Sequence, residues 1–266
     1  MNQFNTPPIV KGLLVINIVI YGLQSLLPNG MGALITEHLG LHYFGSPLFR
    51  VYQIFTHIFL HGSFAHLFSN MFALWMFGKL LEFEISSKRF LIYYTICGIG
   101  AALLHSGIVA LEISSVQESV AAFLSNPTPE MFDALVVDNF KGIAVQEDFL
   151  NNWYEMPENA NYIQSAINAA NGLMARNIDT VTVGASGAIF GILLAFGMMH
   201  PNDRIMLLIP PIPMKAKYFV LGYALIELYL GLADASSNIA HFAHLGGMIF
   251  GFFILRYWKK TGQIYY

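Results

Sequence analysis

The chain has 266 residues, of which 56% are hydrophobic and 11% are charged. Soluble domains carry roughly 25% charged residues, so this composition excludes an ordinary soluble domain and is typical of a membrane protein. The single cysteine, Cys97, excludes an intramolecular disulfide and is expected to be a small core residue.

Six segments are apolar and about long enough to cross a bilayer, which takes roughly 20 residues of helix. The first is interpreted as a retained helix and not a signal peptide, because only Lys11 precedes its apolar run and no small-residue cleavage site follows. The predicted spans cover residues 9–27, 54–78, 90–111, 181–199, 216–233 and 238–257.

The basic residues are unequally divided between the two sides that six spans define. Of the 13 lysines and arginines, only Arg50, Lys141 and Arg176 fall on the side opposite the termini. Basic residues accumulate in cytoplasmic loops. We therefore expect a multi-pass protein with both termini in the cytoplasm, in a bacterial inner membrane.

The loop over residues 28–53 is less polar than an ordinary loop. It contains a mildly amphipathic stretch, Ala33–Leu41, and the aromatic residues Phe44 and Phe49. Two interpretations stay open: a disordered connector, or a loop in the membrane interface, where aromatic rings are stabilised.

The second span carries three histidines and an asparagine in its outer part. His66 and Asn70 are four residues apart and share a helix face. Polar groups within a membrane tend to face the bundle interior and find partners there. His57 and His61 have the same spacing, but no nearby carboxylate or cysteine completes a metal site, so hydrogen bonds to loop backbone are expected for them.

The third span contains Gly98 and Gly100, which permit close helix packing, and a lone His105 without an assigned role. Residues 113–180 then form a polar stretch, and ten of the 16 acidic residues lie between Glu112 and Asp179. We interpret residues 113–180 as an extracytoplasmic insertion that shapes substrate access or binds a partner. It has no nucleophile–base or metal-ligand cluster and is not basic enough to bind nucleic acid.

The last three spans carry glycines and isolated polar residues. The fourth contains the run Gly184–Gly191 with one serine, Ser186, and the sixth begins near His244 and contains Gly247 and Gly251. The fifth contains Glu227, which is either part of a functional site or paired with a neighbouring polar group.

The topology places three polar side chains at one depth. Spans two, four and six enter from the extracytoplasmic side, and His66, Ser186 and His244 are each expected one to two turns inside their helices. At a rise of about 1.5 Å per residue, all three lie some 5–15 Å below the outer surface. If these helices pack together, the three side chains can share one site.

Such a site suits nucleophilic acyl transfer. A serine hydroxyl needs an adjacent base, and His244 is the candidate. Asn70, His66 and the Ser186 backbone N–H are candidate oxyanion donors. The competing interpretation is that Ser186 bonds only within its helix and the glycines serve packing alone. The glycines expected to bring the fourth and sixth helices together are Gly184, Gly187, Gly191, Gly247 and Gly251.

Three stretches strongly resemble the rhomboid family of intramembrane serine proteases: Gly184-Ala185-Ser186-Gly187, Ala243-His244-Leu245-Gly246-Gly247 with Gly251, and His61-Gly62-Ser63-Phe64-Ala65-His66 with Asn70. The resemblance implies a six-helix core with a serine–histidine dyad and no third carboxylate. It makes Ser186 the nucleophile and His244 the general base, with His66 and Asn70 in the oxyanion hole. Phe190 stands where the family often has a tyrosine packed against the base.

Two features depart from the family pattern. A tryptophan–arginine pair common before the second helix reads Tyr52-Gln53 here, and the 113–180 insertion is longer than the usual connection. The expected fold class is nevertheless an all-α polytopic membrane protein, a six-transmembrane-helix rhomboid-like bundle. It forms a single membrane domain over residues 1–266, with the polar insertion between helices three and four.

The expected activity is that of a serine endopeptidase that cleaves transmembrane proteins in the lipid bilayer, with no cofactor and no metal. Two alternatives stay open: a catalytically inactive rhomboid-like binder of membrane proteins, and a small proton-coupled transporter that uses Glu227 and the buried histidines. The intact Ser186–His244 pair argues against the first, and the lack of an obvious inverted repeat argues against the second.

Overall fold

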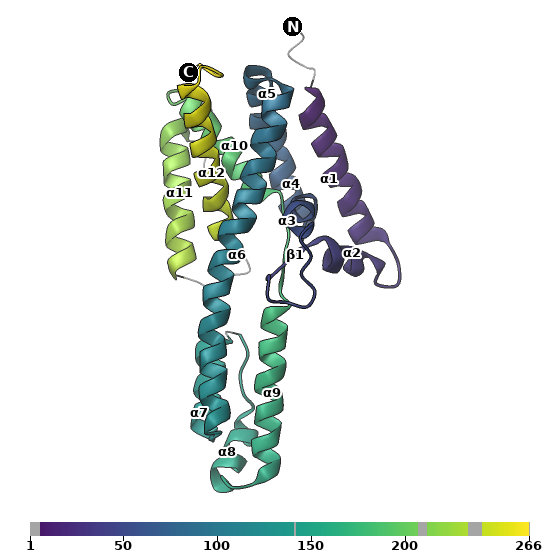
Figure 1. Ribbon diagram of the computed structural model, residues 1–266, viewed down its shortest axis with the longest axis vertical. Coiled ribbons are helices and arrows are strands. Elements are labelled where there is room, and N and C mark those ends of the chain that lie inside the picture. Colours follow the sequence, from purple (N-terminus) through teal and green to yellow (C-terminus); the bar gives the residue numbers. More distant parts are fainter. Residues whose placement is uncertain (1–5, 141, 207–211, 234–240, 266) are drawn as a thin grey trace. The chain divides into compact units, whose positions relative to one another are not determined.

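The computed structural model describes residues 6–140, 142–206, 212–233 and 241–265, and most of them are helical (Figure 1). The chain forms two compact units. One consists of Met1–Leu41, Leu48–Ser106 and Val181–Tyr266, and the other of His42–Pro47 and Gly107–Thr180. Residues 238–240 of the sixth predicted span lie outside the described residues.

The first unit holds most of the helices. Its elements are α1 (Pro8–Leu26), α2 (Met31–Leu39), β1 (Leu41–His42, which ends in the second unit), α3 (Gln53–Thr56), a 3₁₀ turn η1 (His57–Phe59), α4 (Phe64–Ala73), a π turn η2 (Leu74–Gly78), α5 (Lys79–Ile85), the first half of α6 (Ser87–Ser125), β2 (Val181–Thr182), α10 (Ser186–Met199), β3 (Arg204–Met206), β4 (Pro213–Lys215), α11 (Ala216–Ala233) and α12 (His241–Lys260). β3 and β4 pair as an antiparallel hairpin.

Within the described residues, three helices are long and apolar enough to cross a bilayer: α1, α6 and α11. With the hydrophobic composition, they make the chain an integral membrane protein. α10 is apolar but has only 14 residues.

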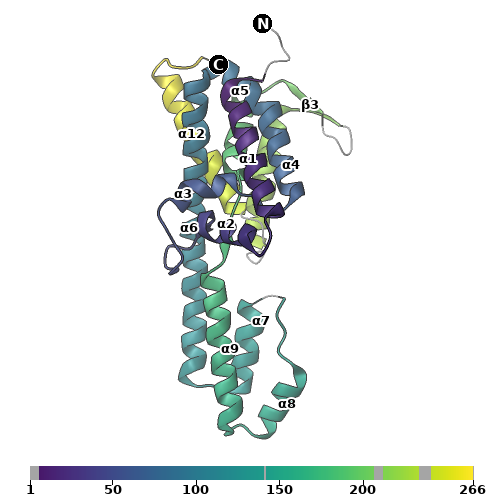
Figure 2. The same cartoon turned by 90° about the vertical axis from the view of Figure 1, so that its right-hand side faces the viewer.

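α10 is the central helix of the first unit. It packs against α4, α5, α11 and, most extensively, α12. Ten of its 14 residues are buried, which is expected of a helix that is apolar all round. α1 lies beside α4 and η2 (Figure 2).

Glycines set the close approach of α10 to its neighbours. A Cβ at Gly247 on α12 would overlap the carbonyl oxygen of Gly187 on α10. A Cβ at Gly191 would overlap the Cys97 side chain, and one at Gly251 would come within 3.2 Å of the same sulfur. α10, α12 and the first half of α6 therefore touch almost backbone to backbone.

A buried carboxylate holds the start of α1. The two carboxylate oxygens of Glu82 on α5 accept hydrogen bonds from the backbone N–H groups of Ile9 (3.1 Å) and Val10 (2.8 Å). The Ser87 hydroxyl donates a third hydrogen bond to Glu82, at 2.6 Å. Glu82 thus satisfies N–H groups that have no partner within the first turn of α1.

The structure corrects the boundaries of three predicted spans. The segment predicted as 54–78 is interrupted at residues 60–63, and α4 begins only at Phe64, because Ser63 caps it by accepting from the His66 backbone N–H at 3.1 Å. The segment predicted to start at 181 is extended until α10 begins at Ser186. The helix predicted to end at 111 continues to Ser125, since no proline or glycine interrupts residues 112–125.

The second unit has its own core. It consists of the second half of α6, α7 (Pro129–Asn139), α8 (Glu147–Glu155) and α9 (Ala160–Ile178). Trp153 is fully buried, with its ring 6.2 Å from Phe132 and 5.8 Å from Phe149. Ala166 and Ala170 present one small-residue face of α9 to this core.

Candidate active site

Ser186 is the first residue of α10, so the expectation that it lies one to two turns inside a helix is wrong. The segment leading to it is fixed by Gly184, whose φ of 135° disfavours any side chain. The Gly184 N–H donates to the His57 carbonyl at 3.0 Å. Ser186 therefore stands at the start of a helix, where backbone N–H groups lack intrahelical partners.

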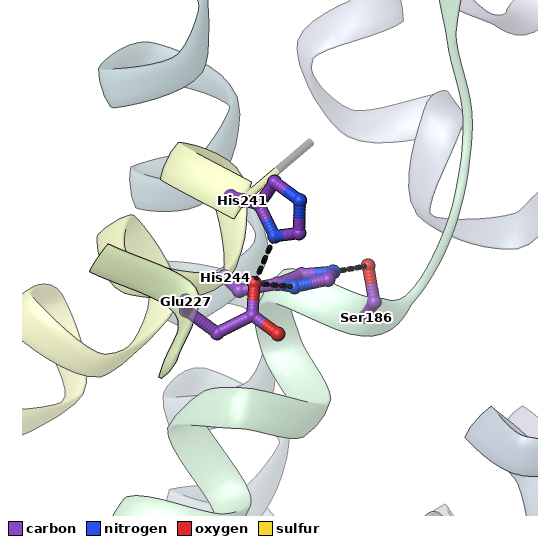
Figure 3. A network of polar contacts seen from close by, with 4 residues as sticks. All are labelled: Ser186, Glu227, His241 and His244. Atoms are coloured by element: carbon purple, nitrogen blue, oxygen red, sulfur yellow. Dashed lines mark hydrogen bonds and ion pairs between the residues drawn. The ribbon is translucent and has the colours of Figure 1, made fainter. Parts of the chain in front are cut away.

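The Ser186 side chain meets His244 in the first turn of α12. The distance between Ser186 Oγ and His244 Nε2 is 2.9 Å (Figure 3). This is a hydrogen bond between a hydroxyl and a ring nitrogen. The serine and the histidine that the sequence argument paired thus lie within reach of proton transfer.

Aromatic stacking fixes the plane of the His244 ring. Phe190, one turn after Ser186 on α10, lies parallel to it, with ring centroids 4.2 Å apart and an interplanar angle of 4°. Phe190 also stacks on Tyr223 of α11, with ring centroids 5.1 Å apart and an interplanar angle of 16°. Phe190 is thus in a position to hold the imidazole by ring contact alone.

Glu227 on α11 completes a network that sequence reasoning left open. Its Oε2 lies 2.8 Å from His244 Nδ1 and 2.6 Å from His241 Nδ1 (Figure 3). Glu227 and His241 are both buried. His241 has no role that was predicted from the sequence. Its position three residues before His244 places both histidines on one face of the same helix, and this spacing could have predicted a shared partner.

Glu227, His241 and His244 also have the donor atoms of a metal site. Their ligand atoms lie within 4.8 Å of one another. The two N···O distances, however, are those of hydrogen bonds from ring N–H groups to a carboxylate. In this network both Nδ1 atoms carry a proton. A metal would instead need the lone pair of an unprotonated nitrogen.

His66 lies beside Gly184, in the segment that leads to Ser186. A Cβ at Gly184 would lie 2.9 Å from His66 Nε2 and 3.6 Å from Ser186 Oγ, so all three groups border one small volume. Asn70, one turn further along α4, is buried, and its Nδ2 has no partner among the described residues. The two donors predicted for the oxyanion thus share a face of α4.

Among the other histidines of the first unit, His57 and His61 are buried and His105 is partly buried. His57 Nδ1 donates to the Gln53 carbonyl at 3.0 Å, and His105 Nε2 is hydrogen-bonded to Thr182 Oγ1 at 2.9 Å. The ring of His61 packs edge-on against His66 at 5.1 Å. A cavity of about 10 Å³, room for one water molecule, is lined by His57, His105, Thr182, Gly184 and Ser186, among others.

Known proteins that this chain resembles include a protein family and a plant protein. A family model described as the Rhomboid domain matches residues 48–123 and 159–260. The protein named Rhomboid-like protein 11, chloroplastic, from Arabidopsis thaliana is 38% identical over 72 residues, which are 27% of this chain and 26% of that protein. The chain therefore spans about a quarter of the length of this relative.

Proposed function

Because this chain belongs to the rhomboid family, we propose that it is an intramembrane serine endopeptidase that cleaves transmembrane proteins by a Ser186–His244 pair. The observation that carries the proposal is the 2.9 Å contact between Ser186 Oγ and His244 Nε2. A serine hydroxyl becomes a nucleophile when an adjacent base accepts its proton.

Catalysis has two halves. Ser186 Oγ attacks the scissile carbonyl while its proton passes to His244 Nε2, and the imidazolium then gives that proton to the leaving amine. Water hydrolyses the acyl-enzyme by the same steps, with His244 again acting as the base and returning the proton to Ser186. The site must therefore be open to water after the first product leaves.

The tetrahedral intermediates carry a negative oxygen, which needs hydrogen-bond donors. The backbone N–H of Ser186 lies at the start of α10, where the helix dipole favours a negative charge. His66 and Asn70 are the proposed side-chain donors, and removing one such donor typically costs roughly 3–4 kcal/mol of transition-state stabilisation.

The proposed topology has six spans, with both termini in the cytoplasm and Ser186 near the extracytoplasmic face. The distribution of the lysines and arginines supports it. The substrate is a transmembrane protein whose helix unwinds near that face, since the serine must reach a peptide carbonyl. Residues 113–180 are proposed as an insertion within this single membrane domain, available for partner binding.

The test is covalent labelling of the purified protein in detergent with a fluorophosphonate, together with cleavage of a transmembrane test substrate. We expect wild type to label and cleave, and Ser186→Ala and His244→Ala to do neither. Ser119→Ala is the matched control, because the Ser119 hydroxyl donates to the Ser115 carbonyl of its own helix, in the second unit and outside the proposed site. Labelling that persists in Ser186→Ala would assign the nucleophile to another serine.

The two alternatives predict different results. An inactive rhomboid-like binder neither labels nor cleaves, yet retains a transmembrane protein on affinity capture. A proton-coupled transporter acidifies proteoliposomes in a manner that depends on Glu227 and is independent of Ser186.

A further inference from the structure

We propose that Glu227, held in place by His241, is a positioning residue that orients His244 and selects its reactive tautomer. Ser186, His244 and Glu227 would then act as a triad, whereas the resemblance to the rhomboid family implied a serine–histidine dyad. The inference rests on the proposed function and names an additional part of the same site.

The hydrogen-bond chemistry of the three groups determines the tautomer. A carboxylate only accepts hydrogen bonds, so the 2.8 Å contact requires the proton of neutral His244 to be on Nδ1. Its Nε2 then carries a lone pair that faces Ser186 Oγ at 2.9 Å. In the other tautomer Nε2 would carry the proton, and His244 could not accept one from the serine.

Glu227 also acts after the proton has moved. When Ser186 attacks, its proton goes to Nε2, and His244 becomes an imidazolium with N–H groups on both nitrogens. The negatively charged carboxylate then accepts a hydrogen bond from the imidazolium, with Oε2 2.8 Å from Nδ1. Glu227 is buried, so this attraction is less screened than in water.

His241 keeps the carboxylate in place. Its Nδ1 donates to the same oxygen, Oε2, at 2.6 Å, and its ring stands nearly perpendicular to that of His244, at 89°. A buried carboxylate is costly unless it is hydrogen-bonded. With two donors on one oxygen, Glu227 cannot rotate away from His244 without losing both bonds (Figure 3).

The competing explanation is that Glu227 only ties α11 to α12. A structural tie would affect stability, whereas a positioning residue affects turnover and the tautomer of His244. The chain offers a matched control in Glu82, another buried carboxylate with several hydrogen bonds, which holds α1 and lies outside the proposed site.

The experiment compares wild type, Glu227→Gln and Glu82→Gln in detergent. kcat and KM are measured on a transmembrane substrate, and the folded fraction of each variant is measured by circular dichroism. We expect Glu227→Gln to lower kcat by ~100- to 10,000-fold, as the loss of the carboxylate does in other triads, with KM within about threefold of wild type. Glu82→Gln should keep kcat within about twofold. Wild-type turnover by Glu227→Gln would overturn the proposal.

A second measurement does not depend on proteolysis. Nitrogen-15 NMR of histidine-labelled protein, with His244 assigned from the His244→Ala spectrum, should show protonated Nδ1 and unprotonated Nε2 in wild type, and loss of that preference in Glu227→Gln. Protonated Nε2 in wild type would overturn the proposal. Failure of wild type to cleave would instead count against the proposed function, while the tautomer result still decides the role of Glu227.

Discussion

At the scale of single residues, His244 is constrained in every direction that matters for proton transfer. Phe190 fixes the plane of its ring, and Glu227 and Ser186 occupy its two nitrogens. Orientation of this kind is a large part of enzymatic rate enhancement, because the reacting groups need not search for one another.

Phe190 provides a direct test of the stacking contribution. We expect Phe190→Ala to lower kcat by about tenfold or more, because the imidazole gains freedom to tilt. Phe190→Tyr should stay within about threefold of wild type, because the ring contact at 4.2 Å is retained. The measurement is kcat on a transmembrane substrate. Equal turnover by Phe190→Ala and wild type would show that stacking is dispensable.

The residue scale also shows what the sequence could and could not predict. Ser186 and His244 were paired from their spacing and expected depth, and they are hydrogen-bonded; their catalytic roles stay a prediction. The contact of Glu227 with both histidines depends on how α11 is rotated against α12. That rotation is a tertiary property, which neither the hydrophobicity of α11 nor the position of Glu227 determines.

At the scale of elements, local caps decided where helices begin. Hydrophobicity alone misses the break at residues 60–63 in the second span, and it starts the fourth span at residue 181, five residues before α10 begins. Ser63 and Gly184 are the local signals that mark the true starts. The π turn η2 between α4 and α5 could likewise not be predicted from the sequence, since no residue type specifies it.

The α10–α12 contact yields a prediction about glycine. We expect Gly247→Ala to destabilise the protein by about 1–3 kcal/mol and to reduce fluorophosphonate labelling, because its Cβ would force α12 away from Gly187. Gly222→Ala on α11 is the control, since nothing lies within 4 Å of its Cβ position and alanine favours a helix. Thermal unfolding in detergent gives the comparison. A Gly247→Ala variant as stable as Gly222→Ala would refute the close packing.

At the scale of the whole molecule, the chain divides into two units with separate cores. We expect Trp153→Ala to raise amide hydrogen exchange across α7, α8 and α9 and to leave α10 protected, because Trp153 lies in the core of the second unit. The neighbouring Tyr154, which is 46% exposed, provides the control Tyr154→Ala. Exchange that rises equally in α10 would mean that the units unfold together.

The proposed topology is testable in intact cells. On a Cys97→Ser background, single cysteines replace Lys88 and Glu158, which are both exposed. We expect a membrane-impermeant maleimide added outside to label only Glu158→Cys, because the basic turn at Lys88 belongs to the cytoplasmic side. The reverse pattern would invert the orientation.

The shared oxygen of Glu227 has a consequence for how a substrate enters. Glu227 belongs to α11, whereas both histidines that it contacts belong to α12. If α11 swings outward to admit a substrate helix, the carboxylate leaves with it, and His244 loses the partner proposed to select its reactive tautomer. Opening by this route then lowers the reactivity of the Ser186–His244 pair, which recovers when α11 returns.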